Sequence, residues 1–335
     1  MGGFGTRREA EEAVRVLVTG STSMIGKAVV DRLIARGDDV STLQRNPSGR
    51  SDVAEVQGSI TDIDAVQHAV AGQDAVIHLA AKVDIMGDLD EFVQINVEGT
   101  TNMISAAREA GITRFVYIST PSVAHGGDSI MGAGADPADP DSTTGHYATT
   151  KAMAEKLALA ESSDAMPVVA IRPHLVIGPG DTQLVERILD RARSGRMPLI
   201  GNGLSLVDVT WVDNAADAMI AALDQCPNLG GQAFVVSNGE PRTVHELIGR
   251  ITRAAGVVWS PRSVPRKVAI LGGTLAEKIW ELTGRDHEPP MTAFGAEQLS
   301  TAHWFDQRAT REALQWEPQV SLAEGFERLA EHYAT

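Results

Sequence analysis

Short apolar runs alternate with helix-forming segments through the first half of the chain, and this alternation constrains the fold more than any other feature. Residues 14–18 and 75–80 are mostly apolar, as expected for strands that are covered on both faces of a sheet. Residues 24–36 instead carry apolar side chains at helical spacing, and Gly37 follows them. A strand–helix–strand succession builds right-handed βαβ units. The sequence therefore predicts an α/β fold with a doubly wound parallel sheet.

A glycine-bearing turn joins the first expected strand to the first expected helix. Gly20 would let the chain turn tightly, and Gly26 would let the helix pack closely on the strand. The free N–H groups of the helix N-terminus would then face a diphosphate, although Ser23 stands where a glycine is usual. The turn predicts a Rossmann-type dinucleotide site, and an ordinary strand-to-helix turn is the alternative. The expected contact residues in the turn are Gly20, Ser21, Ser23, Met24, Ile25 and Gly26.

The choice of cofactor depends on the residues that end the second expected strand. An acidic side chain there would accept hydrogen bonds from the adenosine ribose and repel a 2′-phosphate. Residues 44–48 contain no acid, but Arg45 could pair with a 2′-phosphate. We therefore expect NADP in preference to NAD, with a solvated surface arginine as the alternative.

A tyrosine and a lysine stand four residues apart, at positions 147 and 151. On a helix this spacing places Tyr147 and Lys151 on one face, one turn apart. The ammonium could then lower the phenol pKa, about 10 when unperturbed, toward the range of a general acid/base. The alternative is a helix tyrosine beside a lysine that reaches solvent. The location between two apolar strands favours catalysis.

Further polar residues belong to the same edge of the predicted sheet, because parallel sheets bind ligands at the carboxyl ends of their strands. Ser119, Thr120 and Ser122 are each candidates to hydrogen-bond a substrate carbonyl. His174 is a weaker candidate for a second acid/base, since a lone histidine is more often structural. The segments expected along this edge are Gly20, 79–81, 119–120 and 172–176.

Charge and cysteine content exclude several classes of protein. There are 29 Lys and Arg against 44 Asp and Glu, so the formal charge of −15 argues against a nucleic-acid or anionic-membrane binder. Cys226 is the one cysteine, which excludes an intrachain disulfide and fits a reducing cytosol; we expect it to be a small buried residue. No apolar run approaches the roughly 20 residues that span a bilayer, and no spaced ligand set suggests a metal. We expect a cytoplasmic protein that binds a small molecule.

The chain is expected to have two parts. Residues 14–180 would form the dinucleotide-binding Rossmann domain, and 181–335 mainly a substrate-binding lobe, with some segments returning to the first domain. Residues 1–13 are expected to be a disordered lead-in, and 126–141 a loop rich in Gly, Ala, Asp and Pro. The expected strands are 14–18, 40–44, 55–57, 75–80, 115–119 and 168–172, and the expected helices are 24–36, 62–71, 97–110, 147–162, 182–194, 213–224, 243–255 and 268–282.

With these motifs, the chain resembles the extended short-chain dehydrogenase/reductase family, often called NAD-dependent epimerase/dehydratases, from about residue 14 to residue 334. Within that family it is most similar to the 3β-hydroxysteroid dehydrogenase-like branch, which includes bacterial 2-alkyl-3-oxoalkanoate reductases. The segments that carry the resemblance are 119–123, 147–151 with Ala154 and Glu155, 172–181, 207–214 and 299–306.

The resemblance implies roles for individual residues. Tyr147 would donate and accept the proton, Lys151 would bind the nicotinamide ribose, and Thr120 would take the place of the catalytic serine or threonine. Ser59 stands where an aspartate often contacts the adenine, which leaves Ile60 as the expected neighbour. The further cofactor contacts implied are Leu79, Ala80, Ala81, Asn96, Pro173 and Val176.

Our hypothesis is an NADP-dependent ketone reductase for an apolar β-keto acid or hydroxysteroid-like substrate, with Tyr147 as acid/base. One alternative is a nucleotide-sugar epimerase, dehydratase or reductase, whose diphosphate would bind arginines such as Arg187, Arg191 and Arg250. The other alternative is a non-catalytic regulator that senses the cofactor. The family often dimerises through helices such as 97–110 and 147–162, so the resemblance also implies a homodimer.

Overall fold

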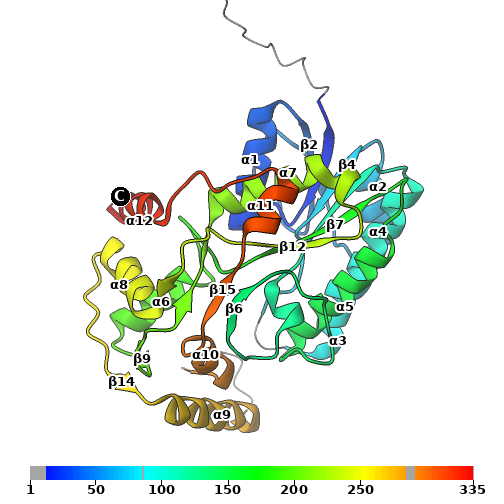
Figure 1. Cartoon of the computed structure of the whole chain (residues 1–335). Coiled ribbons are helices and arrows are strands. Elements are labelled where there is room, and N and C mark those ends of the chain that lie inside the picture. The colour runs from blue at the N-terminus through cyan, green and yellow to red at the C-terminus, as the bar shows by residue number, and fades with distance from the viewer. Residues whose placement is uncertain (1–12, 85–86, 284–290, 335) are drawn as a thin grey trace, which may run out of the picture.

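A parallel sheet of seven strands lies at the centre of the protein, in the order β12-β7-β5-β4-β1-β2-β3 (Figure 1). The computed structural model describes residues 13–84, 87–283 and 291–334. The interior strands β1, β4, β5 and β7 are almost entirely buried, which explains their continuous apolar sequences. The predicted Rossmann-type fold is thereby confirmed. The strands of this sheet are β1 (Arg15–Thr19), β2 (Asp39–Gln44), β3 (Ala54–Gln57), β4 (Ala75–His78), β5 (Arg114–Ile118), β7 (Val168–Pro173) and β12 (Ala233–Val236).

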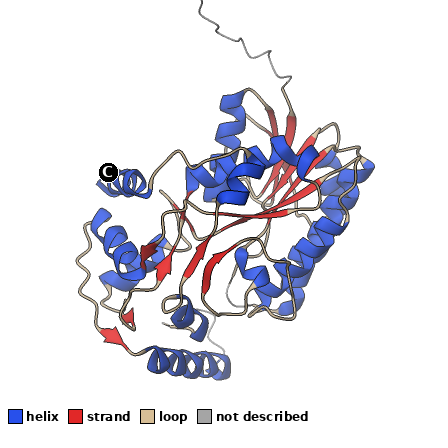
Figure 2. Cartoon of the chain, viewed as in Figure 1, coloured by secondary structure: helices blue, strands red, loops and turns tan. Residues whose placement is uncertain are grey.

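Helices cover both faces of the sheet (Figure 2). Along β1, Val16 and Val18 belong to the core formed with α1 and α7, whereas Leu17 belongs to the core formed with α2, α4 and α5. This alternation follows from the two-residue period of a strand. The covering helices are α1 (Met24–Arg36), α2 (Ile63–Val70), α4 (Gly99–Glu109), α5 (His146–Ala160) and α7 (Val212–Leu229).

Local signals set the ends of α1 where the sequence predicts them. The Ser23 hydroxyl caps the helix by accepting a hydrogen bond from the Gly26 N–H at 3.0 Å. Gly37 ends it with a φ of +96°, which glycine adopts easily. The helix expected over 97–110 differs, because two shorter elements precede α4 without a break. These elements are α3 (Leu89–Phe92) and the π-helical turn η1 (Val93–Glu98).

The second half of the chain forms a lobe of short strands and helices, at the lower left of Figure 1, and also returns to the large sheet. There β12 pairs with β7, and Leu314 of α11 joins the core of α1 and α7. None of the described helices combines the length and the apolar character needed to cross a bilayer. The remaining helices are η2 (Pro121–Ala124), α6 (Val185–Arg193), α8 (Val244–Ala254), α9 (Arg266–Thr283), α10 (Ala293–Gln298), α11 (Arg308–Leu314) and α12 (Leu322–Ala334), and the remaining strands are β6 (Ile130–Ala133), β8 (Val176–Ile177), β9 (Leu199–Ile200), β10 (Leu206–Val207), β11 (Thr210–Trp211), β13 (Arg242–Thr243), β14 (Ser263–Val264) and β15 (His303–Phe305).

The expected loop 126–141 contains strand β6, so that prediction is wrong for these residues. Ile130 is buried, and β6 pairs in parallel with β15 from a distant part of the chain. A strand this short is stabilised by its partner rather than by its own sequence, which explains why the loop-like composition concealed it. Cys226 is fully buried, as expected. The expected lead-in 1–13 lies outside the described residues except for residue 13.

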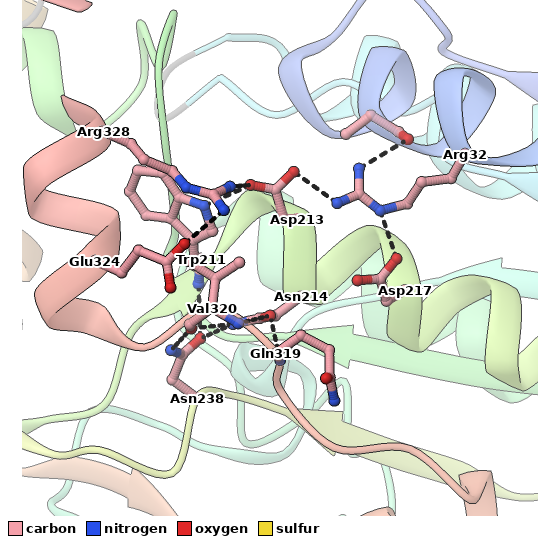
Figure 3. A network of polar contacts seen from close by, with 11 residues as sticks. Arg32, Trp211, Asp213, Asn214, Asp217, Asn238, Gln319, Val320, Glu324 and Arg328 are labelled. Atoms are coloured by element: carbon pink, nitrogen blue, oxygen red, sulfur yellow. Dashed lines mark hydrogen bonds and ion pairs between the residues drawn. The ribbon is translucent and has the colours of Figure 1, made fainter. Parts of the chain in front are cut away.

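Polar side chains tie helix α7 to α1 and to the C-terminal helix (Figure 3). Asp213, near the start of α7, accepts hydrogen bonds from Arg32 of α1 at 2.6 Å and from Arg328 of α12 at 3.1 Å. Arg32 also pairs with Asp217, one turn further along α7. The same few charges therefore bind three helices together.

Asn214 fixes the segment between α11 and α12 (Figure 3). It is fully buried, and its amide oxygen accepts hydrogen bonds from the backbone N–H groups of Gln319 at 2.9 Å and Val320 at 3.0 Å. Its amide nitrogen donates to the Val320 carbonyl at 2.7 Å and to Asn238 at 2.9 Å. One side chain thus satisfies backbone groups that no helix or strand pairs.

Replacing Asn214 by alanine is expected to lower the free energy of unfolding by about 2–4 kcal/mol, because buried N–H groups lose their acceptor. Urea unfolding followed by circular dichroism measures the change. Gln319→Ala is the matched control, since Gln319 reaches Asn214 only through its backbone. Equal stability of the two variants would contradict this role for Asn214.

Candidate active site

The order of the sheet reverses between β1 and β4, and the turn after β1 lies directly against the end of β4. Gly20 has a φ of +71°, and a Cβ there would lie 2.9 Å from the Ala80 nitrogen. A Cβ on Gly26 would lie 2.3 Å from the Gly20 oxygen. Both glycines are therefore required by the backbone, and they form a tight cradle at the switch point where dinucleotides bind such sheets.

Ser23 takes the usual place of a glycine without strain. Its φ is −68°, an ordinary value for any residue, and its hydroxyl donates to the Gly20 carbonyl at 2.9 Å while capping α1. Ser21 is buried and its hydroxyl contacts the Gln44 side chain, whereas Met24 and Ile25 are partly exposed. The first turn of α1 contains no acidic residue, so its N-terminus remains suited to an anion.

The end of β2 carries both an arginine and a carboxylate. Arg45 is exposed, and no other side chain in the described ranges pairs with its guanidinium. Glu55 comes from the neighbouring strand β3 and accepts hydrogen bonds from the Ser48 hydroxyl and the Gln44 amide, both at 2.5 Å. Those hydrogen bonds lower the pKa of Glu55. The residues at the end of β2 give no sign of this carboxylate in the sequence, because Glu55 belongs to the neighbouring strand β3.

Asn96 lies in the π-helical turn and positions the loop after β4. It is buried, its oxygen accepts from the Lys82 N–H at 2.7 Å, and its nitrogen donates to the Lys82 carbonyl and to Thr150 of α5, each at 3.1 Å. Its hydrogen bonds therefore link the loop that begins at Leu79 to α5. Leu79, Ala80 and Ala81 of that loop are each partly exposed.

The residues expected near the adenine and the nicotinamide differ in how far they are buried. The hydroxyls of Ser59 and Thr61 form a hydrogen bond of 2.8 Å. Ile60 is buried against Gly99, and a Cβ on Gly99 would lie 2.7 Å from the Ile60 side chain. Ile60 is thus mainly a packing residue. Pro173 and Val176 are partly exposed at the end of β7.

Leu175, which sequence analysis did not single out, lies between Pro173 and Val176 with a φ of +39°. Non-glycine residues avoid this conformation, and it is found most often at functional sites. It turns the chain at the strand end, where His174 is buried while the side chain of Leu175 is partly in solvent.

The structure brings Thr120, Tyr147 and Lys151 together at the carboxyl end of β5. Tyr147 and Lys151 lie on α5, and the Thr120 side chain lies close enough to the Tyr147 phenol to influence its pKa. Lys151 is 3% exposed, and its ammonium donates to the Ile118 carbonyl at 2.5 Å and lies 4.1 Å from the centre of the Tyr117 ring. Of the three candidate hydroxyls, Thr120 is the one that influences the pKa of Tyr147.

Burial dominates the electrostatics of this group. It raises the pKa of Tyr147 to about 12, against the opposing effect of the Thr120 hydrogen bond. It lowers the pKa of Lys151 to about 7, against the opposing charge of Glu155. The expectation that the Lys151 ammonium lowers the phenol pKa is not met in the protein alone, where burial raises that pKa.

A buried ion pair connects α5 to strand β7. Glu155, one turn beyond Lys151, accepts two hydrogen bonds from the Arg172 guanidinium, at 2.9 and 2.5 Å. Both side chains are 1% exposed. Arg172 also donates to the Asp136 carbonyl at 2.7 Å, which attaches the segment that contains β6. The pair therefore joins α5, β7 and the segment before α5.

His174 has two histidine neighbours that sequence analysis did not find. His125, His174 and His303 line a single hollow, together with Ser122 and Ala148. They stand far apart in the sequence and meet only because β15 pairs with β6. His303 lies within the segment 299–306 that carried the family resemblance, which was the one signal in the sequence that could have pointed to it.

The arginines expected for a sugar diphosphate lie on α6 and α8 of the lobe. Arg250 pairs with Glu246 at 2.8 Å and packs over the Phe326 ring at 5.7 Å. Its guanidinium is thus already bound within the lobe, and nothing in its contacts favours a nucleotide sugar.

Comparisons with known proteins match most of the chain. A family model described as the NAD dependent epimerase/dehydratase family matches residues 16–237. A 2-alkyl-3-oxoalkanoate reductase of Stenotrophomonas maltophilia is 40% identical over 324 residues, which cover 94% of this chain and 98% of that protein. A 3 beta-hydroxysteroid dehydrogenase/Delta 5→4-isomerase of Mycobacterium tuberculosis is 30% identical over 347 residues, 97% of this chain and 91% of that protein.

Solved structures share the fold. The structure of UDP-glucuronic acid 4-epimerase from Bacillus cereus in complex with NAD superimposes with a TM-score of 0.71 at 20% sequence identity. The match covers 96% of this chain and 98% of the epimerase chain. At that identity the likeness concerns the architecture alone, and the sequence relatives are the better guide to chemistry.

Proposed function

The chain belongs to the NAD dependent epimerase/dehydratase family and is an NAD(P)-dependent oxidoreductase of the extended short-chain dehydrogenase/reductase type, and we propose that it reduces 2-alkyl-3-oxoalkanoic acids with NADPH. The observation that carries the proposal is the junction of Thr120, Tyr147 and Lys151 at the sheet edge, in a chain 40% identical to a reductase of that name. A hydroxysteroid-like alcohol is the second substrate considered, because of the 30% identical dehydrogenase.

Tyr147 is suited to donating a proton to a developing alkoxide. A pKa of about 12 keeps its phenol protonated at neutral pH, which matches the acid role in the direction of reduction. Thr120 lies beside it and can hold the same oxygen. Lys151, with a pKa of about 7, can exchange a proton at neutral pH and resupply the phenol.

The turn after β1 fits a dinucleotide on its own geometry. Its two glycines allow the close backbone contacts of a tight turn, and α1 presents its N-terminus there. When bound, the nicotinamide supplies the hydride for the carbonyl carbon. In this proposal Gly20, Ser23 and Gly26 hold the diphosphate, and the partly exposed Pro173 and Val176 border the nicotinamide.

Arg45 supports NADPH as the preferred cofactor, while Glu55 opposes it. Arg45→Ala is expected to raise the KM for NADPH at least tenfold and to leave that for NADH nearly unchanged, since a charged hydrogen bond to phosphate contributes about 1.5–3 kcal/mol. Glu55→Gln should change the NADPH-to-NADH ratio in the opposite direction. Steady-state kinetics with both cofactors measures these ratios, with the exposed Arg253→Ala as the control. Equal losses with both cofactors would contradict the assignment of Arg45.

The substrate is tested by consumption of NADPH and NADH with a 2-alkyl-3-oxoalkanoic acid. Rapid loss of NADPH supports the whole proposal, and faster loss of NADH keeps the reaction but rejects the cofactor preference. Loss of neither, with cofactor binding intact, would move the assignment to a hydroxysteroid-like alcohol.

We also propose that the protein is a homodimer and that it is located in the cytoplasm. The helices considered for the dimer are α4 and α5, and Met153 on α5 is 39% exposed, an apolar side chain that a partner could cover. Light scattering of the purified protein tests the assembly.

A further inference from the structure

Three imidazoles from distant parts of the chain meet beside the proposed reacting groups. His125 follows η2, His174 follows β7, and His303 begins β15. The rings of His174 and His303 lie 6.1 Å apart, and those of His174 and Phe305 lie 5.1 Å apart. The three histidines form the wall of one hollow, here called the histidine cluster.

The hollow adjoins the candidate catalytic group. Ser122, which lines it, accepts a hydrogen bond of 3.4 Å from the Thr120 hydroxyl, and Ala148, which also lines it, follows Tyr147 in α5. The hollow therefore lies next to residues that adjoin Thr120 and Tyr147 in the chain.

The protonation of His174 follows from its partner. Its Nδ1 lies 2.5 Å from the Asp208 carbonyl oxygen, which can only accept a hydrogen bond. The proton of the neutral ring is therefore on Nδ1, and Nε2 keeps a lone pair. No second hydrogen bond of this ring is formed by the described residues.

The same reasoning applies to His303. Its Nε2 lies 2.9 Å from the Thr301 hydroxyl, whose single proton is already donated to the Glu297 carbonyl at 2.7 Å. Nε2 must then be the donor, which leaves a lone pair on Nδ1. That Nδ1 atom and Nε2 of His125 are buried without any partner in the described part of the chain. An unpaired buried polar atom costs about 1–3 kcal/mol, so these atoms indicate an interaction with a ligand.

The cluster is neutral in the protein alone. Burial lowers the pKa values of His174 and His303 to about 4, and none of the three rings forms an ion pair with a described residue. The Asp208 carboxylate accepts hydrogen bonds from Ser237, Gly239 and Glu240 instead. The other charged groups around the cluster are Asp128 at the hollow, Asp136 and Arg172 near His125, Glu155 paired with Arg172, and Glu297 beside Gly127.

We propose that the histidine cluster binds the carboxylate of the substrate, with one proton taken up from solvent by an imidazole that faces the hollow. The inference rests on the proposed function, because a 3-oxo acid carries its carboxyl carbon two bonds from the carbonyl carbon and so requires an anion site next to Tyr147. Protonation turns a lone pair into an N–H donor, and the ion pair with the carboxylate compensates for burial. Among the described residues no group of His, Cys, Asp and Glu side chains has the arrangement of a metal site.

The proton that is taken up with the acid sets the pH dependence of acid binding. Between the pKa of the free imidazoles and that of the bound one, each unit of falling pH should strengthen acid binding about tenfold, because one proton enters with each acid. An uncharged ester would bind without this dependence.

Two variants, each of which removes one ring nitrogen of a histidine, test the histidine cluster. His174→Asn keeps a donor where Nδ1 contacts Asp208 and removes Nε2, and His303→Gln keeps a donor to Thr301 and removes Nδ1. The substrates are a stable 2-alkyl-3-hydroxyalkanoate and its methyl ester, oxidised with NADP. We expect the wild type to prefer the acid, and each variant to lose at least tenfold in the ratio of kcat/KM for acid to ester. His68→Asn, on the exposed face of α2, is the control.

Calorimetry of acid binding in two buffers of different ionisation enthalpy gives a second readout, with close to one proton taken up per acid near pH 7. An unchanged acid-to-ester ratio in both folded variants, or binding without proton uptake, would overturn the inference and leave the reductase proposal standing. If the wild type oxidises neither compound, the proposed function fails, and calorimetry, which needs no turnover, still decides the subsite: absence of acid binding overturns it.

Discussion

Tyr147→Phe is expected to lower kcat by about a thousandfold, within the range of 10²–10⁴ that general acid catalysis contributes. The variant lacks only the phenolic hydroxyl. Since the ring is kept, the packing of α5 and the position of Lys151 should not change. Single-turnover and steady-state kinetics with the β-keto acid measure the loss.

Binding of NADPH separates chemistry from folding in this experiment. The dissociation constant, followed by nicotinamide fluorescence, should change less than threefold, because Tyr147 contributes no charge to the cradle around Gly20. Tyr333→Phe is the matched control, since that phenol lies on α12 and bonds Glu186. If Tyr147→Phe kept more than a tenth of the wild-type kcat, another group would have to supply the proton.

Elements whose signals are local could be predicted closely from the sequence. Helix α1 has its cap, its apolar stripe and its stop within one short segment, and its bounds match. The shared face of Tyr147 and Lys151 likewise follows from helix geometry alone. In these places local propensity and the global fold agree, which is what a foldable sequence requires.

Features that depend on distant partners could not be predicted. Strand β6 needs β15, and the histidine cluster needs both, so nothing near His125 indicates His303. The carboxylate of Glu55 reaches the end of β2 only through the pairing of β2 with β3. The pKa of Tyr147 is a third case, because the spacing of residues in the sequence could not give the burial that raises it.

Glu155→Gln is expected to lower the free energy of unfolding by about 3–5 kcal/mol, because it leaves the buried Arg172 guanidinium without a countercharge. The Arg172 guanidinium forms two hydrogen bonds to Glu155, and both side chains are 1% exposed. The expected loss of unfolding free energy is therefore large for a single substitution. Thermal unfolding should occur roughly 4–7 °C lower. The same change removes the charge that raises the pKa of Lys151, so the pH at which activity loses the Lys151 proton should fall.

The double variant Glu155→Leu with Arg172→Met separates the two effects. Replacing a buried ion pair by apolar groups of similar volume is often neutral in stability, so most of the lost free energy should return. The pH profile should stay displaced, because Lys151 still lacks its carboxylate neighbour. A Glu155→Gln protein as stable as the wild type would show that the pair is not what holds α5 to β7. A double variant with the wild-type pH profile would show that Glu155 acts on stability alone.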